Sequence, residues 1–231
     1  MAGTGFFDFA LLHLEDAFRS APDQNCAVQG TGPCKGASMR HLIILAVAVF
    51  CSSCAQLPPA DVVNAPPRQA QAVVFDIDGT LTPSVTTIFE AREDAARAVR
   101  LFADKGYQII YLSTRASWFS ARIPGWLQDN GFPAGSLHVA QTDEDRSRPD
   151  AYKTGMLKTF LAHGWRVSFA YGDSSTDFSA YAAAGIPKES VFALLRRYEA
   201  DCQPGEWKAC LKGWTEHLDF VARSVPSVPA N

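Results

Sequence analysis

Two pairs of aspartates follow apolar runs in the sequence, at positions where buried strands are expected to end. Asp76 and Asp78 come directly after one run, and Asp173 and Asp177 come after another. Carboxylates at the end of a buried strand destabilise the fold unless a cation or hydrogen bonds hold them. Hard divalent cations such as Mg²⁺ take carboxylate oxygens as ligands. The two pairs therefore indicate a cation site, and the alternative is a strand-end turn in which the aspartates bond to nearby backbone.

The elements that must position these acids alternate along the chain. We expect strands at 72–75, 108–112, 136–139, 167–171 and 190–194, and helices at 88–105, 118–130, 150–162 and 176–184. This alternation with short connections predicts an α/β fold, a Rossmann-like three-layer sandwich with a mostly parallel sheet. The carboxyl ends of such strands meet at one edge of the sheet, which would bring the four aspartates together.

The order of the motifs resembles that of the haloacid dehalogenase-like (HAD) superfamily. Asp76-Ile77-Asp78-Gly79-Thr80 matches its DxDGT hallmark, Ser113 its hydroxyl motif, Lys153 its basic motif, and Gly172–Asp177 its GDxxxD motif. The resemblance covers about residues 72 to 195. It implies a HAD-like fold and phosphatase chemistry.

Within that superfamily the chain resembles most the catalytic domain of lipin-type phosphatidate phosphatases and their bacterial relatives. The segments that carry this resemblance are Asp76–Thr82, Tyr111–Arg115, Arg148–Lys153, Tyr171–Tyr181 and Gly185–Pro187. It implies phosphatidate or another bulky phosphomonoester as the substrate. The connections between motifs are too short for a large cap domain, so we expect an open site.

The chemistry expected of the acids follows from the charge of the substrate. A carboxylate that attacks a phosphate monoester meets anion–anion repulsion, so a divalent cation, here Mg²⁺, must bridge the two. Asp76 is expected to attack phosphorus and form an aspartyl-phosphate. Asp78 is expected to protonate the leaving alcohol and then to deprotonate the water that hydrolyses the intermediate. The expected metal ligands are Asp76, the backbone carbonyl of Asp78, Asp173 and, directly or through water, Asp177.

Four residues are expected to bind the phosphoryl oxygens of the substrate: Thr80, Ser113, Thr114 and Lys153. The ammonium of Lys153 would offset charge in the pentacoordinate state. Lys158 and Arg148 are alternatives to Lys153 for this role, and Arg115 is either a substrate contact or a surface arginine.

Two further groups near the motifs have two readings each. Trp118, Phe119 and Trp126 follow the second motif and form either an apolar wall at the mouth of the site or part of the core. The charged connection at 143–148 is either a solvated loop or a substrate-selecting segment.

The N-terminal part predicts export. Residues 39–55 hold a basic residue, an apolar run and a small-residue site, as in a signal peptide, so we expect translation to start at residue 39 and residues 1–38 to be an upstream extension. Ser53-Cys54 resembles a bacterial lipobox, in which acylated Cys54 is a membrane anchor, whereas cleavage after Ala55 would release a soluble protein. Either route predicts a periplasmic protein or an outer-membrane-anchored lipoprotein. Residues 56–71 are proline-rich and predict a linker. The phosphatase domain with a C-terminal extension should occupy 72–231.

Composition excludes several classes of protein. The 231 residues are 47% hydrophobic and 19% charged with a formal charge of −3, which argues against a disordered chain and against a nucleic-acid partner. The apolar runs are too short for a multi-span membrane protein. The six cysteines do not form the CxxC…CxxC pattern, with two such motifs, that supports a zinc site. Export would place Cys202 and Cys210 in an oxidising compartment, where we predict a disulfide rather than two free thiols.

The main hypothesis is therefore an exported, Mg²⁺-dependent phosphomonoester hydrolase that acts on phosphatidate or a related ester. One alternative is a non-catalytic module that senses phosphatidate or phosphate, since some lipin-like domains bind phosphatidate without hydrolysing it. A second is a nonspecific acid phosphatase that scavenges small esters, and a third is a phosphotransferase. The silent lipin-like domains lack the paired acids, so the presence of Asp76 and Asp78 favours catalysis.

Overall fold

The computed structural model describes residues 56–68 and 70–229. The predicted upstream extension, signal peptide and lipobox Cys54 lie outside these residues, so export and acylation stay predictions. Within the described part of the chain, no helix has the length and apolar character needed to cross a bilayer.

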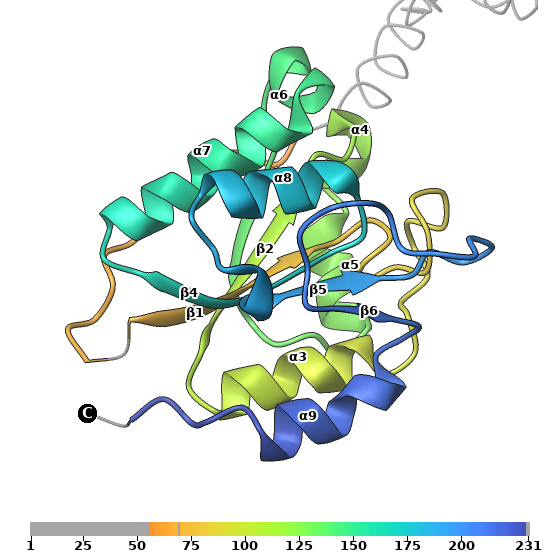
Figure 1. Ribbon diagram of the computed structural model, residues 1–231. Coiled ribbons are helices and arrows are strands. Elements are labelled where there is room, and N and C mark those ends of the chain that lie inside the picture. The colour runs from red at the N-terminus through yellow and green to blue at the C-terminus, as the bar shows by residue number, and fades with distance from the viewer. Residues whose placement is uncertain (1–55, 69, 230–231) are drawn as a thin grey trace, which may run out of the picture. The chain divides into compact units, whose positions relative to one another are not determined.

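A six-stranded sheet lies at the centre of the domain, in the order β3-β2-β1-β4-β5-β6 (Figure 1). Its strands are β1 (Gln71–Asp76), β2 (Gln108–Ser113), β3 (Ser136–Val139), β4 (Arg166–Gly172), β5 (Val191–Leu194) and β6 (Ala209–Leu211). All five pairings are parallel, which confirms the predicted α/β class. Strand β1 pairs on both sides, with β2 and β4, so the first motif begins at the middle of the sheet.

Helices cover both faces of the sheet and complete three layers (Figure 1). One face packs against α3 (Ala95–Asp104), α5 (Ile123–Asp129) and α9 (Leu218–Arg223), and the other against α7 (Pro149–Ala162) and α8 (Ser175–Ala183). Short helices α4 (Ser117–Ser120), α6 (Asp143–Ser147), η1 (Lys188–Ser190) and η2 (Thr215–His217) lie in the connections. Because side chains alternate along a strand, Val73 and Phe75 enter the first core while Val74 enters the second.

The first core is rich in aromatic side chains. The rings of Phe75 and Tyr171 stack with centroids 5.2 Å apart, and those of Tyr171 and Phe192 lie 5.3 Å apart. Trp214 closes this cluster 4.9 Å from Tyr171. Aromatic burial of this kind supplies much of the apolar area that holds β1, β4 and β5 together.

Helix α3 is shorter than the sequence pattern predicts. The expected helix 88–105 begins only at Ala95, because Asp94 adopts a left-handed conformation (φ 58°) and Arg92 is held elsewhere. The Arg92 amide donates to the carbonyl of Leu81 (2.8 Å), and its guanidinium donates to the carbonyl of Gly79 (2.7 Å). The seven residues before Ala95 therefore form a loop above the first motif.

Two other segments also differ from the prediction. The expected helix 118–130 is split into α4 and α5, with Pro124 in the first turn of α5. The charged segment 143–148, expected to be a solvated loop or a substrate-selecting segment, contains helix α6. A capping box starts α6, in which the Thr142 side chain accepts from the Asp145 amide and the Asp145 carboxylate accepts from the Thr142 amide.

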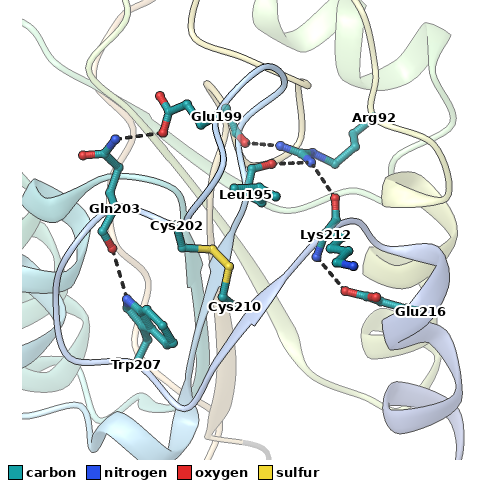
Figure 2. The surroundings of a disulfide bond; sticks show 10 residues. Arg92, Leu195, Glu199, Cys202, Gln203, Trp207, Cys210, Lys212 and Glu216 are labelled. Atoms are coloured by element: carbon teal, nitrogen blue, oxygen red, sulfur yellow. Dashed lines mark hydrogen bonds between the residues drawn. A yellow bond between two sulfur atoms is a disulfide. The ribbon is translucent and has the colours of Figure 1, made fainter.

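The segment after Leu195 is an integral part of the domain. It adds β6 to the sheet edge and packs α9 against α3, with Trp214 and Val221 fully buried. A disulfide joins Cys202 to Cys210 in β6 (Figure 2), as predicted. The loop after β5 is thereby tied to the edge of the sheet.

The described part of the proline-rich segment, residues 56–68, has no helix or strand but contacts the domain. The Trp165 indole donates to the carbonyl of Val63 (2.8 Å), and the Ala65 amide donates to the carbonyl of His163 (2.9 Å). These contacts place Val63 and Ala65 against the end of α7, while Gln56 and Leu57 bond to Gln141 and Ser120.

Candidate active site

A tight turn follows Asp76 at the end of β1. The carbonyl of Ile77 accepts the amides of Leu81 and Thr82 at 2.9 and 3.0 Å. Gly79 lies in this turn with φ +92°, a conformation that glycine adopts without strain, and a Cβ there would be 1.8 Å from a carboxylate oxygen of Asp173. The turn therefore needs glycine at position 79 so that the Asp173 carboxylate can lie against its backbone.

Three aspartates gather where β1 and β4 end. Asp76, Asp173 and Asp177 each offer a carboxylate oxygen, and these oxygens lie within 4.8 Å of one another. All three residues are at most 3% exposed. The parallel pairing of β1 with β4 brings them together, as expected from the strand-end motifs.

Lys153 of α7 lies between two of these acids. Its ammonium donates to one oxygen of Asp76 and one oxygen of Asp177, both at 2.5 Å, and the residue is 3% exposed. Burial alone would lower the pKa of Lys153, but the two carboxylates outweigh it and raise that pKa. The alternatives Lys158 and Arg148 are exposed, so it is Lys153 that the fold brings to the acids.

Asp177 holds Lys153 and its own loop rather than facing outward. Burial raises the pKa of Asp177, but Lys153 and the hydroxyl and amide of Ser174 outweigh this and lower it. The second Asp177 oxygen accepts from the Ser174 hydroxyl (2.7 Å) and from the Asp173 amide (3.2 Å). Its oxygens are thus occupied by this chain's own donors.

Asp76 and Asp173 are the acids with capacity for a cation. One buried oxygen of Asp76, Oδ2, has no hydrogen-bond partner among the described residues. Burial raises the pKa of Asp76 well above its usual range despite the opposing charge of Lys153. Burial, with the nearby Asp177, also raises the pKa of Asp173 to about 7, although Arg196 pairs with it and opposes the shift.

The donor set fits Mg²⁺. Three buried carboxylates face two cations, Lys153 and Arg196, which leaves one negative charge uncompensated. All-carboxylate oxygen ligands together with an unpartnered oxygen suit a hard divalent ion.

Asp78 lies across the turn and pairs with Arg115. The guanidinium of Arg115 donates to Asp78 Oδ1 from Nε (3.0 Å) and Nη2 (2.7 Å), and the Ser113 hydroxyl donates to Asp78 Oδ2 (3.0 Å). Arg115 is 6% exposed, so the reading of a surface arginine is wrong. The single hydroxyl proton of Ser113 is used on Asp78, and the hydroxyl would have to rotate to bind a phosphoryl oxygen.

The two threonines predicted to bind substrate have different surroundings. Thr80 is fully buried, and its hydroxyl oxygen has no partner among the residues that the structure describes. Thr114 is partly exposed just after β2. Both lie at the same edge of the sheet as the acids.

Sequence reasoning missed the roles of Arg196 and Arg92. Arg196 follows β5 and pairs with Asp173, and Arg92 joins the first turn to the carbonyls of Leu195 (2.9 Å) and Lys212 (Figure 2). The only sequence signal for Arg196 is its position at the end of a strand, and nothing local marks Arg92.

Comparison with known proteins places the chain among lipin-like domains. Residues 73–195 match the family model described as the LNS2 domain of PITM 1-3. The chain belongs to the LNS2 family. It is 30% identical over 172 residues to human membrane-associated phosphatidylinositol transfer protein 3, covering 71% of this chain, and 32% identical over 132 residues to the Drosophila melanogaster protein retinal degeneration B, covering 55%.

This family resemblance concerns only part of those relatives. The aligned region is 17% of the human protein's length and 10% of the fly protein's length. A solved structure described as a HAD-like phosphatase from Mesorhizobium loti has a TM-score of 0.52 at 16% identity, covering 75% of this chain and 93% of that one. This likeness supports the HAD-like fold.

Proposed function

We propose that the domain is a Mg²⁺-dependent phosphomonoester hydrolase that forms an aspartyl-phosphate on Asp76. The observation that carries the proposal is the state of Asp76, whose carboxylate is buried among acids with one oxygen on Lys153 and the other without a partner. A structural acid would have both oxygens satisfied. The unpartnered oxygen is available to a metal or to a phosphoryl group.

In the proposed reaction an oxygen of Asp76 bonds to phosphorus while the bond between phosphorus and the ester oxygen breaks. Asp78 gives the departing alcohol its proton. Water then attacks the phosphorus of the aspartyl-phosphate, Asp78 takes the proton of that water, and phosphate leaves with Asp76 restored. Lys153 keeps the Asp76 carboxylate oriented and offsets its charge.

Asp76, Asp173 and the backbone carbonyl of Asp78 are the groups that would hold Mg²⁺, while Asp177 positions Lys153. When bound, the ion supplies positive charge between carboxylate and phosphoryl oxygens and so reduces their repulsion. Arg115 and Ser113 hold the Asp78 carboxylate in place for its two proton transfers.

We propose phosphatidate, or another bulky phosphomonoester, as the substrate. Membership of the LNS2 family supports a lipid, and among the described residues the connections between motifs contain only short loops and helices, with no cap domain. A site without a cap accepts a headgroup that is still attached to a large body.

The test is release of phosphate by the full chain from p-nitrophenyl phosphate and from dispersed phosphatidate, with and without Mg²⁺. We expect Mg²⁺-dependent release that is abolished in Asp76→Asn and in Asp78→Asn. A fold check by circular dichroism accompanies each variant. Release that persists in Asp76→Asn would exclude the aspartyl-phosphate route.

A second candidate is a non-catalytic module that binds phosphatidate. One observation favours it, because Arg115 already pairs with Asp78 and Arg196 with Asp173, which keeps two of the working carboxylates engaged. Binding of phosphatidate vesicles by the folded chain without any phosphate release would support this function instead.

We also propose export, with acylation of Cys54 as the anchor. The disulfide between Cys202 and Cys210 supports an oxidising compartment, where such bonds persist. The mass of the mature protein recovered from the membrane and soluble fractions tests both: a lipid-modified N-terminus at Cys54 supports the anchor, and an unprocessed chain contradicts export.

A further inference from the structure

Arg196 reaches the acid cluster from the loop after β5. Its Nε donates to Oδ2 of Asp173, and the arginine side chain is 19% exposed whereas that of Asp173 is 2% exposed. Lys153, the other cation paired with the cluster, comes from α7 and has a side chain that is 4% exposed. Arg196 therefore has a route to solvent that Lys153 lacks.

The carboxylate that Arg196 holds is one that a metal ion needs. Asp173 is among the three acids whose carboxylate oxygens lie within 4.8 Å of one another. The oxygen that bonds to Arg196 also lies against the first turn, since a Cβ at Gly79 would be 1.8 Å from it. A divalent ion and the guanidinium would thus draw on the same side chain.

The charge of the cluster indicates that the two cations compete. With all three carboxylates ionised, Lys153 and Arg196 leave one negative charge uncompensated. A divalent ion added to this set would leave one positive charge uncompensated among acids that are at most 3% exposed. Without Arg196 the same ion would leave no net charge. Because an uncompensated buried charge is strongly unfavourable, binding of the ion favours release of the arginine.

A second carboxylate is positioned to receive Arg196. Oε1 of Glu199 lies 3.5 Å from Nη1 of Arg196, and the Glu199 side chain is 34% exposed. The other oxygen of Glu199 accepts from the side-chain amide of Gln203 (2.8 Å), which holds this acid in place (Figure 2). A change of rotamer is therefore enough to transfer the guanidinium from Asp173 to Glu199.

The backbone beside Arg196 is held by contacts that do not involve the acid cluster. The amide of the next residue, Arg197, donates to the carbonyl of Pro83 (2.8 Å). The guanidinium of Arg197 forms a bidentate pair with Glu90. The loop thus keeps Arg196 within reach of the cluster whichever acid its side chain contacts.

We propose that Arg196 is an internal cation that competes with Mg²⁺ for Asp173, lowers the affinity of the site for the ion, and moves to Glu199 when the ion binds. The inference rests on the proposed function, which places Mg²⁺ at Asp173. It makes Arg196 a positioning residue that acts through Asp173. The concentration of Mg²⁺ at which the site fills is then set by an arginine outside the metal ligands.

The experiment measures binding of Mn²⁺ to the full chain by electron paramagnetic resonance of the free ion, because Mn²⁺ takes the same oxygen ligands as Mg²⁺. Arg196→Gln removes the competing charge. The matched control Arg197→Gln removes the same charge from the next residue, whose partner Glu90 is exposed. We expect Arg196→Gln to bind Mn²⁺ about tenfold more tightly than the wild type and the control to bind like the wild type. Structural damage would weaken binding, so a gain in affinity is specific to competition.

Two further variants test the two partners of Arg196. Glu199→Gln removes the second partner and should weaken Mn²⁺ binding about threefold, and it decides the proposal if circular dichroism shows that Arg196→Gln does not fold. Combined with Asp173→Asn, Arg196→Gln should no longer strengthen binding. Equal affinity in wild type and Arg196→Gln, or a gain that persists without Asp173, overturns the competition. Equal affinity in wild type and Glu199→Gln overturns the transfer to Glu199.

Failure of the competition is distinguishable from failure of the proposed function. Mg²⁺-dependent phosphate release together with equal Mn²⁺ affinity in wild type and Arg196→Gln supports the hydrolase and overturns the role of Arg196. Tighter Mn²⁺ binding by Arg196→Gln without phosphate release from either ester supports the role of Arg196 and contradicts the hydrolase. Absence of Mn²⁺ binding in both proteins contradicts the metal site and therefore both proposals.

Discussion

Replacement of Lys153 by methionine should strongly destabilise the domain, and the effect should depend on pH. The ammonium contacts two carboxylates at 2.5 Å, and all three groups are at most 5% exposed. Removing one partner of a buried ion pair typically costs about 3–5 kcal/mol, a large share of the roughly 5–15 kcal/mol that stabilises a domain. Urea unfolding followed by tryptophan fluorescence measures the loss.

The pH dependence follows from the acids left behind. Without Lys153 the folded pKa of Asp177 should rise, because its burial is then opposed only by the hydroxyl and amide of Ser174. A carboxyl with a raised folded pKa loses stability as pH rises through that pKa. The deficit of Lys153→Met should therefore be larger at pH 8 than at pH 5.

Two variants make this prediction refutable. Lys158→Met removes an exposed ammonium from the same helix and should change stability by less than about 0.5 kcal/mol. Adding Asp177→Asn to Lys153→Met removes one unpaired charge and should recover about 1–2 kcal/mol. If Lys153→Met unfolds at the same urea concentration as Lys158→Met, the buried ion-pair network described here is wrong.

Three further results are expected. Gly79→Ala should lower phosphatase activity about 100-fold by displacing Asp173. The control is Gly155→Ala, a helical site with open space around its Cβ position, which should leave activity unchanged. Equal activity in the two variants would contradict the close packing of the turn. Burial lowers the pKa of His217 to about 4. As pH falls from about 6.5, the imidazole therefore binds a proton in the unfolded chain but not in the folded one. The free energy of unfolding should fall by about 2 kcal/mol over this range, after allowance for solvent screening. In His217→Phe the free energy of unfolding, measured by urea titration at several pH values, should depend less on pH. An unchanged pH dependence would contradict the assignment to His217. Reduction with dithiothreitol opens the disulfide between Cys202 and Cys210, eight positions apart, and should lower the free energy of unfolding by about 2–3 kcal/mol by the chain-entropy estimate. An unchanged urea midpoint after reduction would contradict a stabilising disulfide.

Much of the sheet could be predicted because buried parallel strands read as short apolar runs. The five expected strands all form within two residues of their predicted ends. The strand-end position of Asp76 and Asp173 was enough to predict that they meet, since parallel strands end at one edge. Strand β6 escaped prediction because its three residues, Ala209–Leu211, are too few to show a pattern.

The parts that could not be predicted depend on contacts between distant residues. The start of α3 is set by Arg92, which bonds to carbonyls of the first turn and of the loop after β5, and helix propensity contains no trace of those partners. The burial of Arg115 likewise depends on Asp78, 37 positions earlier in the chain. Helix α6 is a different case, because Thr142 and Asp145 have the spacing of a capping box, which indicates a helix start in the sequence itself. The high density of charged residues in the segment favoured a solvated loop instead.

The bond between the Trp214 indole and the carbonyl of Thr80 (3.1 Å) has a consequence for the order in which the protein is made. The ribosome releases the first motif early, but the turn that carries it gains this anchor only after 134 more residues have been added. Until then the aromatic faces of Phe75 and Tyr171 lack the ring that closes their cluster. A nascent or prematurely terminated chain would therefore carry every residue proposed for catalysis while the turn that holds Asp76 and Asp78 still lacked this anchor.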